Sequence, residues 1–169
     1  MNIFFTSDTH FSHHNIIEYD QRPFKDVKEM NEKIISNWNA KVPEKSIVYH
    51  LGDFGFGKVE ELKKIRDQLN GSLCLIRGNH DESINKMHEV GFDGIANELT
   101  LHYKGIIFVL THDKDLAYAD VKGTLNVHGH THSPHKFHKN FINVCTSAWG
   151  YTPIGFDELL FEYKQQGRR

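Results

Sequence analysis

Aspartate, asparagine and histidine side chains recur in this sequence directly after short apolar runs, and all three types bind divalent cations. Asp8 and His10 follow the run NIFFT, Asp53 follows SIVYHL, and Asn79 and His80 follow SLCLI. Oxygen and imidazole ligands without thiolate suit Mn, Fe, Zn, Co or Ni rather than a structural cysteine-type zinc site. The first half of the chain therefore supplies candidate ligands for a metal centre.

The second half adds three histidines of the same kind. His112 follows IIFVL, and His130 and His132 follow LNV. The last two are two positions apart, so in an extended segment both point to the same side. Each motif alone is weak, because Gly52-Asp53 is often only a turn and Gly78-Asn79-His80-Asp81 is also typical of an Asx turn with a helix cap. Together and in this order, they predict one shared site.

Such a ligand set points to phosphate ester hydrolysis. Two divalent cations about 3.5–4 Å apart can hold a hydroxide and clamp the oxygens of an in-line displacement. A water bound to such a metal is deprotonated near neutral pH, so no protein base is needed. A carboxylate must bridge the two metals, and Asp53 is the best candidate.

The elements that position these residues are predicted from hydrophobic periodicity. Strands are expected at 2–6, 46–51 and 72–76, and helices at 27–38 and 59–69, the second closed by Asn70-Gly71. A short helix is expected to end at Gly91. The later half predicts strands at 95–103 and 106–110 around a turn at Lys104-Gly105, and a strand at 125–127. A hairpin around Lys139-Asn140 and a closing helix at 156–164 follow.

Alternation of strands and helices, then a strand-rich half, predicts an α/β layered domain with mixed sheets. The length of 169 residues fits a single domain over 1–169. In such sheets, ligands lie outside the carboxyl ends of the strands, where each candidate ligand stands.

Composition limits the partners. A net charge of −2 argues against a broad nucleic-acid-binding face. We find neither a signal peptide nor an apolar run of about 18 residues, so no membrane partner is expected. Cys74 and Cys145 stand in apolar runs and are predicted to be free buried thiols, which favours a cytoplasmic location.

The motifs resemble the signature blocks of calcineurin-like metallophosphoesterases over about residues 1–150. The blocks are Asp8-Thr9-His10, Gly52-Asp53, Gly78-Asn79-His80-Asp81, Thr111-His112 and Gly129-His130-Thr131-His132. Small bacterial and phage members are most similar, because they also begin with an Asp-Thr-His-Phe block and carry a segment like Arg22-Pro23-Phe24. The resemblance implies a four-layer αββα sandwich with two mixed β-sheets.

The resemblance also implies two divalent metal ions, with manganese as the first expectation among Mn, Fe, Zn, Ni and Co. One would be held by Asp8, His10, Asp53 and His132. The other would be held by Asp53, Asn79, His112 and His130. A hydroxide that bridges the metals would attack phosphorus, with His80 facing the leaving group beside Asp53 and Asn79.

One position departs from the family pattern. Many relatives carry Gly-Asp-x-x-Asp, whose second Asp orients the catalytic histidine, but Phe56 stands there in this chain. What orients His80 is therefore open. Phe11, Phe54 and Phe56 adjoin the ligand loops, and they either stack on an aromatic leaving group or pack in the core.

Four residues near the motifs are candidate substrate contacts: His14, Asn15, Arg22 and Arg77. His14 and Asn15 could instead cap the next helical turn. Arg22 offers a guanidinium for a phosphate, or a surface ion pair. Arg77 could reach an oxyanion or serve a structural role.

The predicted function is a metal-dependent phosphoesterase acting on a small phosphorylated substrate, either a diester or a monoester. One alternative is a nuclease acting on nucleic acid ends, which the net charge disfavours. The other is a non-catalytic scaffold of the same fold. Relatives with that role have lost the histidine that faces the leaving group, whereas His80 is present here. The oligomeric state and the natural substrate are not predicted.

Overall fold

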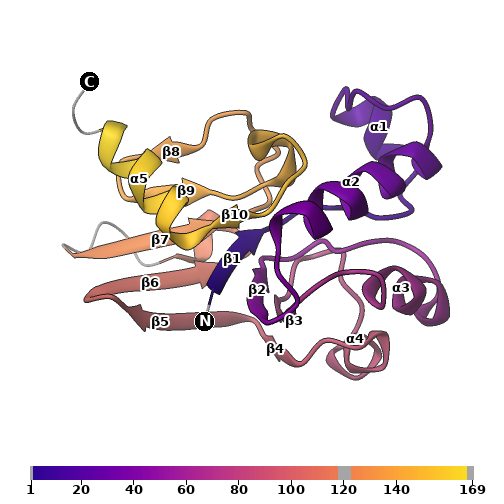
Figure 1. Ribbon diagram of the computed structural model, residues 1–169, viewed down its shortest axis with the longest axis horizontal. Helices are drawn as coiled ribbons and strands as arrows, with labels where there is room; N and C mark the ends of the chain where they lie inside the picture. The colour runs from indigo at the N-terminus through magenta and orange to yellow at the C-terminus, as the bar shows by residue number, and fades with distance from the viewer. Residues whose placement is uncertain (1, 118–122, 167–169) are drawn as a thin grey trace.

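Two sheets and five helices make up the molecule, for which a computed structural model describes residues 2–117 and 123–166 (Figure 1). The first half contains β1 (Asn2–Thr6), α1 (Ile16–Tyr19), α2 (Val27–Lys41), β2 (Ser46–His50), α3 (Val59–Arg66), β3 (Ser72–Ile76), α4 (Ile84–Val90) and β4 (Gly94–Ala96). The second half contains β5 (Glu98–Tyr103), β6 (Ile106–Thr111), β7 (Thr124–His128), β8 (Phe137–His138), β9 (Phe141–Asn143), β10 (Ile154–Gly155) and α5 (Phe156–Gln166), with 3-10 turns η1 (Lys114–Leu116) and η2 (Thr146–Trp149).

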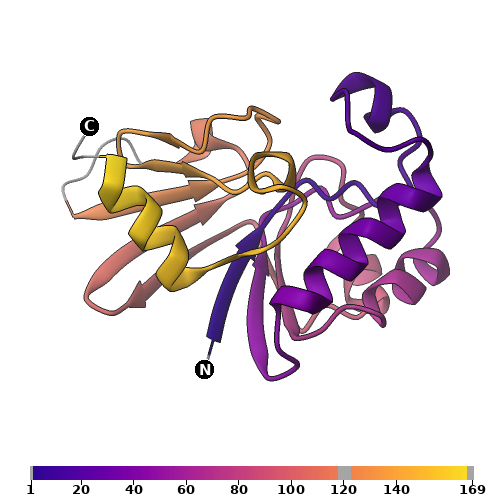
Figure 2. The same cartoon turned by 45° about the horizontal axis from the view of Figure 1, so that its top comes forward.

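Each sheet has five strands and is mixed, as expected. The first has the order β10-β1-β2-β3-β4, and only the β10–β1 pair is antiparallel. The second has the order β5-β6-β7-β9-β8, with antiparallel pairs at both edges and parallel pairs between. Helices α2, α3 and α4 lie on the side of the first sheet, and α5 lies against the second (Figures 1 and 2). The expected αββα arrangement is confirmed.

Strands of the first sheet are apolar on both faces because each face meets a different core. In β1, Phe4 packs in the core beneath α2 and α3, whereas Phe5 packs in the core shared with the second sheet. In β2, Val48 and Tyr49 divide in the same way. This period-two division fixes the register, since a slip of one residue would exchange the two cores.

The carboxyl ends of the parallel strands meet at one place. β1, β2 and β3 run in parallel, so the loops after them leave from the same edge. β6 and β7 are likewise parallel in the second sheet. Ser7 and Cys145 form a parallel bridge, and the amide of Thr146 donates to the Ser7 carbonyl at 2.9 Å. The two sheets are therefore joined where the predicted ligands stand.

Helix bounds differ from the predicted ones at three places, the smallest difference being at α5, which runs two residues further than expected, to Gln166. α2 runs three residues further than expected, to Lys41, and ends where Pro43 forces Val42 into an extended conformation. α3 ends at Arg66, so the predicted closure at Asn70-Gly71 is wrong. The guanidinium of Arg66 donates to the carbonyls of Leu69 and Gly71 at 3.3 Å, which stabilises a turn in place of the last helical residues.

The predicted single strand at 95–103 is also wrong. It divides into β4, which pairs with β3 in the first sheet, and β5, which pairs with β6 in the second. The chain changes sheet at Asn97, a polar residue that interrupts the apolar alternation between Ile95 and Leu99. The turn at Lys104-Gly105 is confirmed, with positive φ at both residues. None of the helices in the described ranges is both long and apolar enough to cross a membrane.

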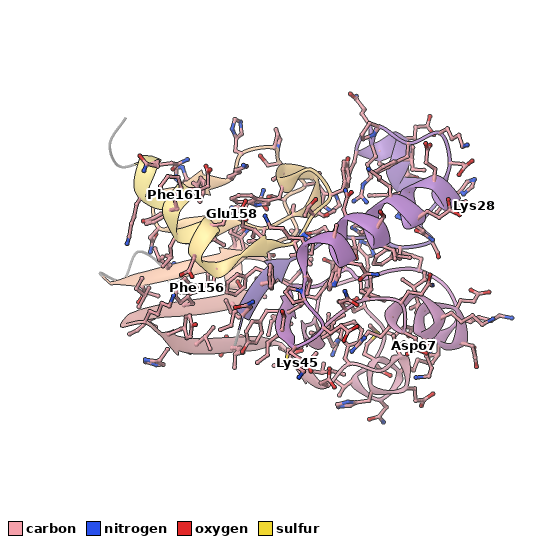
Figure 3. The ribbon with its side chains drawn as sticks, in the orientation of Figure 1. Lys28, Lys45, Asp67, Phe156, Glu158 and Phe161 are labelled. Carbon is pink, nitrogen blue, oxygen red and sulfur yellow. The ribbon has the colours of Figure 1, made fainter. Side chains whose placement is uncertain are left out.

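Polar side chains cover the outer helix faces. Lys28 on α2 and Asp67 after α3 point away from the body of the molecule (Figure 3). At the other end, Glu158 on α5 pairs with Lys41 on α2 at 2.6 Å, and this ion pair joins the two helical layers. Both partners are about half exposed, so the pair contributes little to stability.

One histidine lies in the core rather than at the metal ligands. His50, at the end of β2, is fully buried, and its Nε2 lies 3.0 Å from the hydroxyl of Thr9. Its ring stacks with Trp38 and meets Phe54 edge-on. Burial lowers the pKa of His50 to about 4, although the carboxylates of Asp81 and Asp8 oppose this shift. His50 is therefore a neutral core residue near neutral pH.

His50 should make the metal-free protein less stable in acid. Between pH 6.5 and 4 the unfolded chain binds a proton on this residue that the folded chain excludes. The stability is complete above pH 6.5 and decreases as the pH falls toward 4, with a loss of about 2 kcal/mol at pH 5. Urea unfolding at pH 7 and pH 5 measures the loss. His50→Gln should reduce it by that amount, whereas His88→Gln on the exposed face of α4 should not. An unchanged loss in His50→Gln would contradict the assignment.

Candidate metal centre

Two groups of metal-binding side chains converge at the joined edges of the sheets. Ligand atoms of each group lie within 4.8 Å of one another. The first group is Asp8, His10, Asp53 and His132, and the second is Asp53, His112 and His130. Asn79 joins the second, because its Oδ1 lies 3.1 Å from His112 Nε2. The structure thus brings together all seven residues predicted as ligands, and Asp53 belongs to both groups.

The first group lies almost wholly below the surface. His132 Nε2 is 3.2 Å from both Asp8 Oδ1 and His10 Nε2. Asp8, His10 and Asp53 are each at most 2% exposed. His132 is half-buried and closes the group toward solvent.

The second group is more open. His112 Nε2 is 3.2 Å from His130 Nδ1, and both His130 and Asn79 are exposed. Asp53 Oδ2 lies 3.6 Å from His112 Nε2 and 3.6 Å from His10 Nε2. One carboxylate oxygen is therefore equally distant from an imidazole of each group.

Hydrogen bonds behind the rings settle which nitrogens face inward. A carbonyl can only accept, so His112 Nδ1 donates to the Leu51 carbonyl at 2.7 Å. Its Nε2 is then the lone-pair atom that faces Asn79 Oδ1 and His130 Nδ1. His132 Nδ1 likewise donates to Asp20 Oδ2 at 2.6 Å. The lone pairs of His112 Nε2 and Asn79 Oδ1 face each other at 3.1 Å and repel unless a cation lies between them, so the second group fits a divalent metal. At the first group, burial lowers the pKa of His132 but its hydrogen bonds to Asp20 and Asp8 outweigh this and raise it to about 9, so a metal there takes the place of the Nε2 proton.

Burial and charge give the same indication. Burial raises the pKa of Asp53; His112 opposes this, while the Asp8 and Asp81 carboxylates add to it. Burial would also raise the pKa of Asp8, but the hydrogen bond from His132 and the imidazole charges hold it well below its usual range. Burial lowers the pKa of His10 to about 3, against the attraction of Asp8. Carboxylates packed in this way favour a bound cation.

The backbone at the ligands is unusual. Asp8, His10, Asp53, His130 and His132 all have φ between 49° and 64°. This left-handed region is uncommon for residues other than glycine and costs of order 1 kcal/mol or more each. Surrounding contacts must therefore hold the ligand loops in place.

Glycines before the ligands permit these loops to cross closely. A Cβ at Gly78 would clash with the Asp53 carboxylate, and one at Gly129 would lie 2.5 Å from Asp8 Oδ2. The Gly-Asn-His and Gly-His-Thr-His motifs thus begin with glycine because another ligand occupies the space of a side chain.

Arg22 was predicted to bind substrate, and the structure corrects this. Its side chain is fully buried, and its Nη1 and Nη2 donate to the carbonyls of Thr9 and Asp8 at 2.9 Å. It also pairs with Asp20 Oδ2 at 3.2 Å. Arg22 therefore supports the loop that carries Asp8 and His10, where the backbone is left-handed. Its donors are used in these contacts and do not face a phosphate.

Asp81 was not predicted to have a role, yet it joins two ligand loops. Its Oδ2 accepts from the amides of Asp53 at 2.9 Å and Gly78 at 2.8 Å, and its Oδ1 accepts from the amide of Phe54 at 2.9 Å. The sequence around Asp81 does not predict this role, because its carboxylate binds amides of residues 27 and 28 positions away along the chain.

Two further contacts behind the ligands were also missed. Asp20 forms a carboxylate–histidine pair with His132, and the Sγ of Cys145 donates to Asp8 Oδ2 at 3.0 Å. Each hydrogen bonds to a ligand on the side away from the metal position and so fixes the orientation of that ligand. Cys74 and Cys145 are free, as predicted. Cys74 is only half-buried.

His80 is exposed and stands beside the first group. Its amide donates to Asp53 Oδ1 at 3.0 Å, and its ring centroid lies 5.9 Å from that of His10 and 5.4 Å from that of Phe56. Among the described residues its ring forms no hydrogen bond. Aromatic neighbours therefore surround this ring where many relatives place a carboxylate.

The other predicted substrate contacts stay predictions. His14 and Asn15 are exposed in the loop before α1, where Asn15 occupies the N-cap position without a side-chain cap bond. Arg77 is half-buried at the end of β3, and its Nε is buried without a partner. Phe11 and Phe54 are core residues, whereas Phe56 is half-buried.

A cavity of about 400 Å³ lies elsewhere on the second sheet. Its lining includes Thr131 and Ser133, which alternate with His130 and His132 along the chain, but none of the seven ligands. We therefore treat the cavity as separate from the candidate centre.

Known proteins share this chain's pattern. A family model described as the calcineurin-like phosphoesterase superfamily domain matches residues 1–148. An uncharacterized protein of Methanocaldococcus jannaschii is 36% identical over 180 residues, which covers 98% of this chain and 93% of that protein. A crystal structure of a protein of unknown function from Aquifex aeolicus has a TM-score of 0.75 at 27% identity, and covers 94% of this chain and 97% of its own.

Asp81→Asn should destabilise the fold although it is isosteric. An amide replaces one carboxylate oxygen with a donor that faces backbone N–H groups, so the free energy of unfolding should decrease by about 1–3 kcal/mol. Urea denaturation measures this. Asp67→Asn, at an exposed ion pair with Lys63, should change it by less than about 0.5 kcal/mol. Equal stability of Asp81→Asn and the wild type would show that the three amides do not need the carboxylate.

Asp20→Asn should weaken metal binding at the first group. The amide can still accept from His132 but no longer supplies the charge that raises ligand basicity, so affinity should decrease roughly 10–100-fold. Titration calorimetry with Mn²⁺ measures the affinity. Glu18→Gln, on the exposed side of α1, removes the same charge without a contact to the ligands and should leave it unchanged. A similar loss in both variants would refute a specific role for Asp20.

Proposed function

Because this chain belongs to the calcineurin-like phosphoesterase superfamily, we propose that it hydrolyses small phosphate esters with two divalent cations, manganese being the first expectation. One cation is held by Asp8, His10, Asp53 and His132. The other is held by Asp53, Asn79, His112 and His130. Bound there, the cations supply electrophilic charge and water activation. The proposed setting is the cytoplasm.

The position of Asp53 is the observation that supports this proposal most strongly. Its Oδ2 is 3.6 Å from an imidazole nitrogen of each ligand group, and its Oδ1 accepts from the His80 amide. A carboxylate shared by two ligand sets is what a dinuclear centre requires. Asp53 thus connects both proposed metal sites with His80, the residue proposed to face the leaving group.

The protein's own residues orient and polarise the ester. His80 projects from the loop that carries Asn79 and is exposed, so its ring can hydrogen bond to an ester oxygen. It would donate a proton to the departing oxygen or stabilise the charge that develops on phosphorus. Arg77, three residues before His80, and the exposed His14 and Asn15 remain candidates for binding a phosphoryl oxygen.

The openness of the second group favours small or extended substrates. His130, Asn79 and His80 are exposed, while Asp8, His10 and Asp53 lie beneath them. A phosphoryl group can therefore approach from the exposed side. The net charge of −2 gives no support to a nuclease, and the presence of His80 and of every ligand disfavours a scaffold.

Hydrolysis of p-nitrophenyl phosphate and bis-p-nitrophenyl phosphate with Mn²⁺ tests the proposal. We expect turnover that EDTA abolishes and that Asp53→Asn removes together with bound metal. The ratio of the two rates distinguishes a monoesterase from a diesterase. Absence of turnover of both esters with Mn²⁺, Fe²⁺, Zn²⁺, Ni²⁺ and Co²⁺ would contradict the proposed activity.

His80→Ala should retain both metals but lose rate, about 10²–10⁴-fold if His80 is a general acid. Elemental analysis measures the metal content. The loss should be larger for phenyl phosphate than for p-nitrophenyl phosphate, because the poorer leaving group needs the proton more. Equal losses would leave His80 an electrostatic role alone, and an unchanged rate would remove it from the reaction. His88→Ala, exposed on α4, is the matched control.

A further inference from the structure

A row of aromatic rings begins at the first ligand group and ends at the surface. Phe56 lies 5.9 Å from His10 and 5.4 Å from His80 between ring centroids. His13 stacks on Phe56 at 4.1 Å with an interplanar angle of 17°. The ring of Tyr19 then meets His13 edge-on at 6.3 Å. We call Phe56, His13 and Tyr19 the aromatic row.

Exposure increases along the aromatic row. His10 is 2% exposed, Phe56 and His13 are half-buried, and Tyr19 is 71% exposed. The row therefore leads outward from the metal ligands on the side where His80 stands. Exposing the aromatic ring of Tyr19 to water is less favourable than covering it with a binding partner. Exposed aromatic residues are enriched at binding sites.

The segment that carries the row is held firmly. The amide of Ser12 donates to Asn31 Oδ1 at 3.0 Å, and Asn31 Nδ2 donates to Ser12 Oγ at 3.2 Å, which ties the loop to α2. Ile16 is buried in the core beneath α2 and anchors α1. Both views show α1 standing out from the body beside α2 (Figures 1 and 2). Tyr19 is thus presented on a fixed support.

Phe56 removes a negative charge from the side of the site where His80 stands. A carboxylate at this position would place negative charge beside His80, where an ester's leaving group departs. Phe56 instead makes this side of the site apolar, and its neighbour His13 adds a second flat ring. Planar groups stack on such rings, whereas a small alkyl group gains little contact from them.

We propose that the aromatic row is a subsite for a leaving group that contains a planar aromatic ring, as an aryl or nucleoside ester does. The subsite rests on the proposed function and specifies its substrate class. In the reaction, a water oxygen bonds to phosphorus and the bond from phosphorus to the aryl oxygen breaks. The aryl oxygen leaves with the electron pair of that bond and takes up one proton, the attacking water gives up one, and the other alcohol stays on the phosphate.

Two methyl diesters that differ only in the leaving group test the subsite. Methyl 2-naphthyl phosphate releases a fluorescent naphthol, and methyl 2,2,2-trifluoroethyl phosphate is followed by fluorine NMR. Tyr19→Ala and His13→Ala should lower kcat/KM for the naphthyl ester about 10-fold, as expected for a lost stacking contact. The trifluoroethyl ester should change less than about 2-fold. Comparing variant with wild type on each ester cancels their intrinsic reactivities.

Two controls separate stacking from folding. Tyr19→Phe keeps the ring and should retain activity on both esters. Phe161→Ala removes a ring that is 61% exposed on α5, away from the row (Figure 3), and should affect neither ester. Equal effects of Tyr19→Ala on the two esters, with Tyr19→Phe unchanged, would overturn the subsite while leaving the phosphoesterase function intact.

If the wild type hydrolyses neither diester, hydrolysis of p-nitrophenyl phosphate decides whether the protein is a phosphoesterase, and the subsite is decided by binding alone. Methyl 2-naphthyl phosphate is then not consumed, and its naphthyl fluorescence reports the dissociation constant with the Mn²⁺-loaded protein. The subsite predicts about 10-fold weaker binding to Tyr19→Ala than to the wild type. Equal affinity would overturn it.

Discussion

The structure is organised around carboxylates and imidazoles that share one buried place. Asp8, Asp53 and Asp81 stand together beneath the surface, and burial raises the pKa of Asp53 there. Such a concentration of acidic groups is unfavourable unless hydrogen bonds, cationic side chains or metal ions compensate for it. The backbone amides that donate to these carboxylates, and the imidazoles beside them, follow from that requirement.

Holding the ligands also requires a costly backbone. Left-handed conformations at five ligand positions persist because the loops are fixed from several directions. Arg22 donates to carbonyls in the loop after β1. Asp81 accepts from amides in the loops after β2 and β3. The bridge between Ser7 and Cys145 joins the two sheets at the same edge. Rigid scaffolding of this kind keeps ligand atoms within the narrow distances that a metal pair needs.

The surroundings of His80 set this chain apart from the family pattern that has a second aspartate. Phe56 and His13 offer flat, uncharged surfaces on the leaving-group side, while the charged ligands stay beneath. His80 is exposed, and its ring has Phe56 and His10 as aromatic neighbours in place of a charged hydrogen-bond partner. The rings beside it can accommodate an apolar leaving group.

The sequence by itself determined the ligand types, their order and the strands that deliver them. Those features are local: a short apolar run followed by Asp, Asn or His identifies a strand end, and glycine before the ligand identifies a close crossing. The sequence could not decide contacts between distant segments. Arg22 resembled a phosphate-binding residue, Asp81 resembled a turn residue, and the polar Asn97 alone did not show that the strand at 95–103 divides between two sheets. Only the tertiary structure decided these roles, because each depends on which loops pack together, and that is set by two separate cores and not by spacing along the chain.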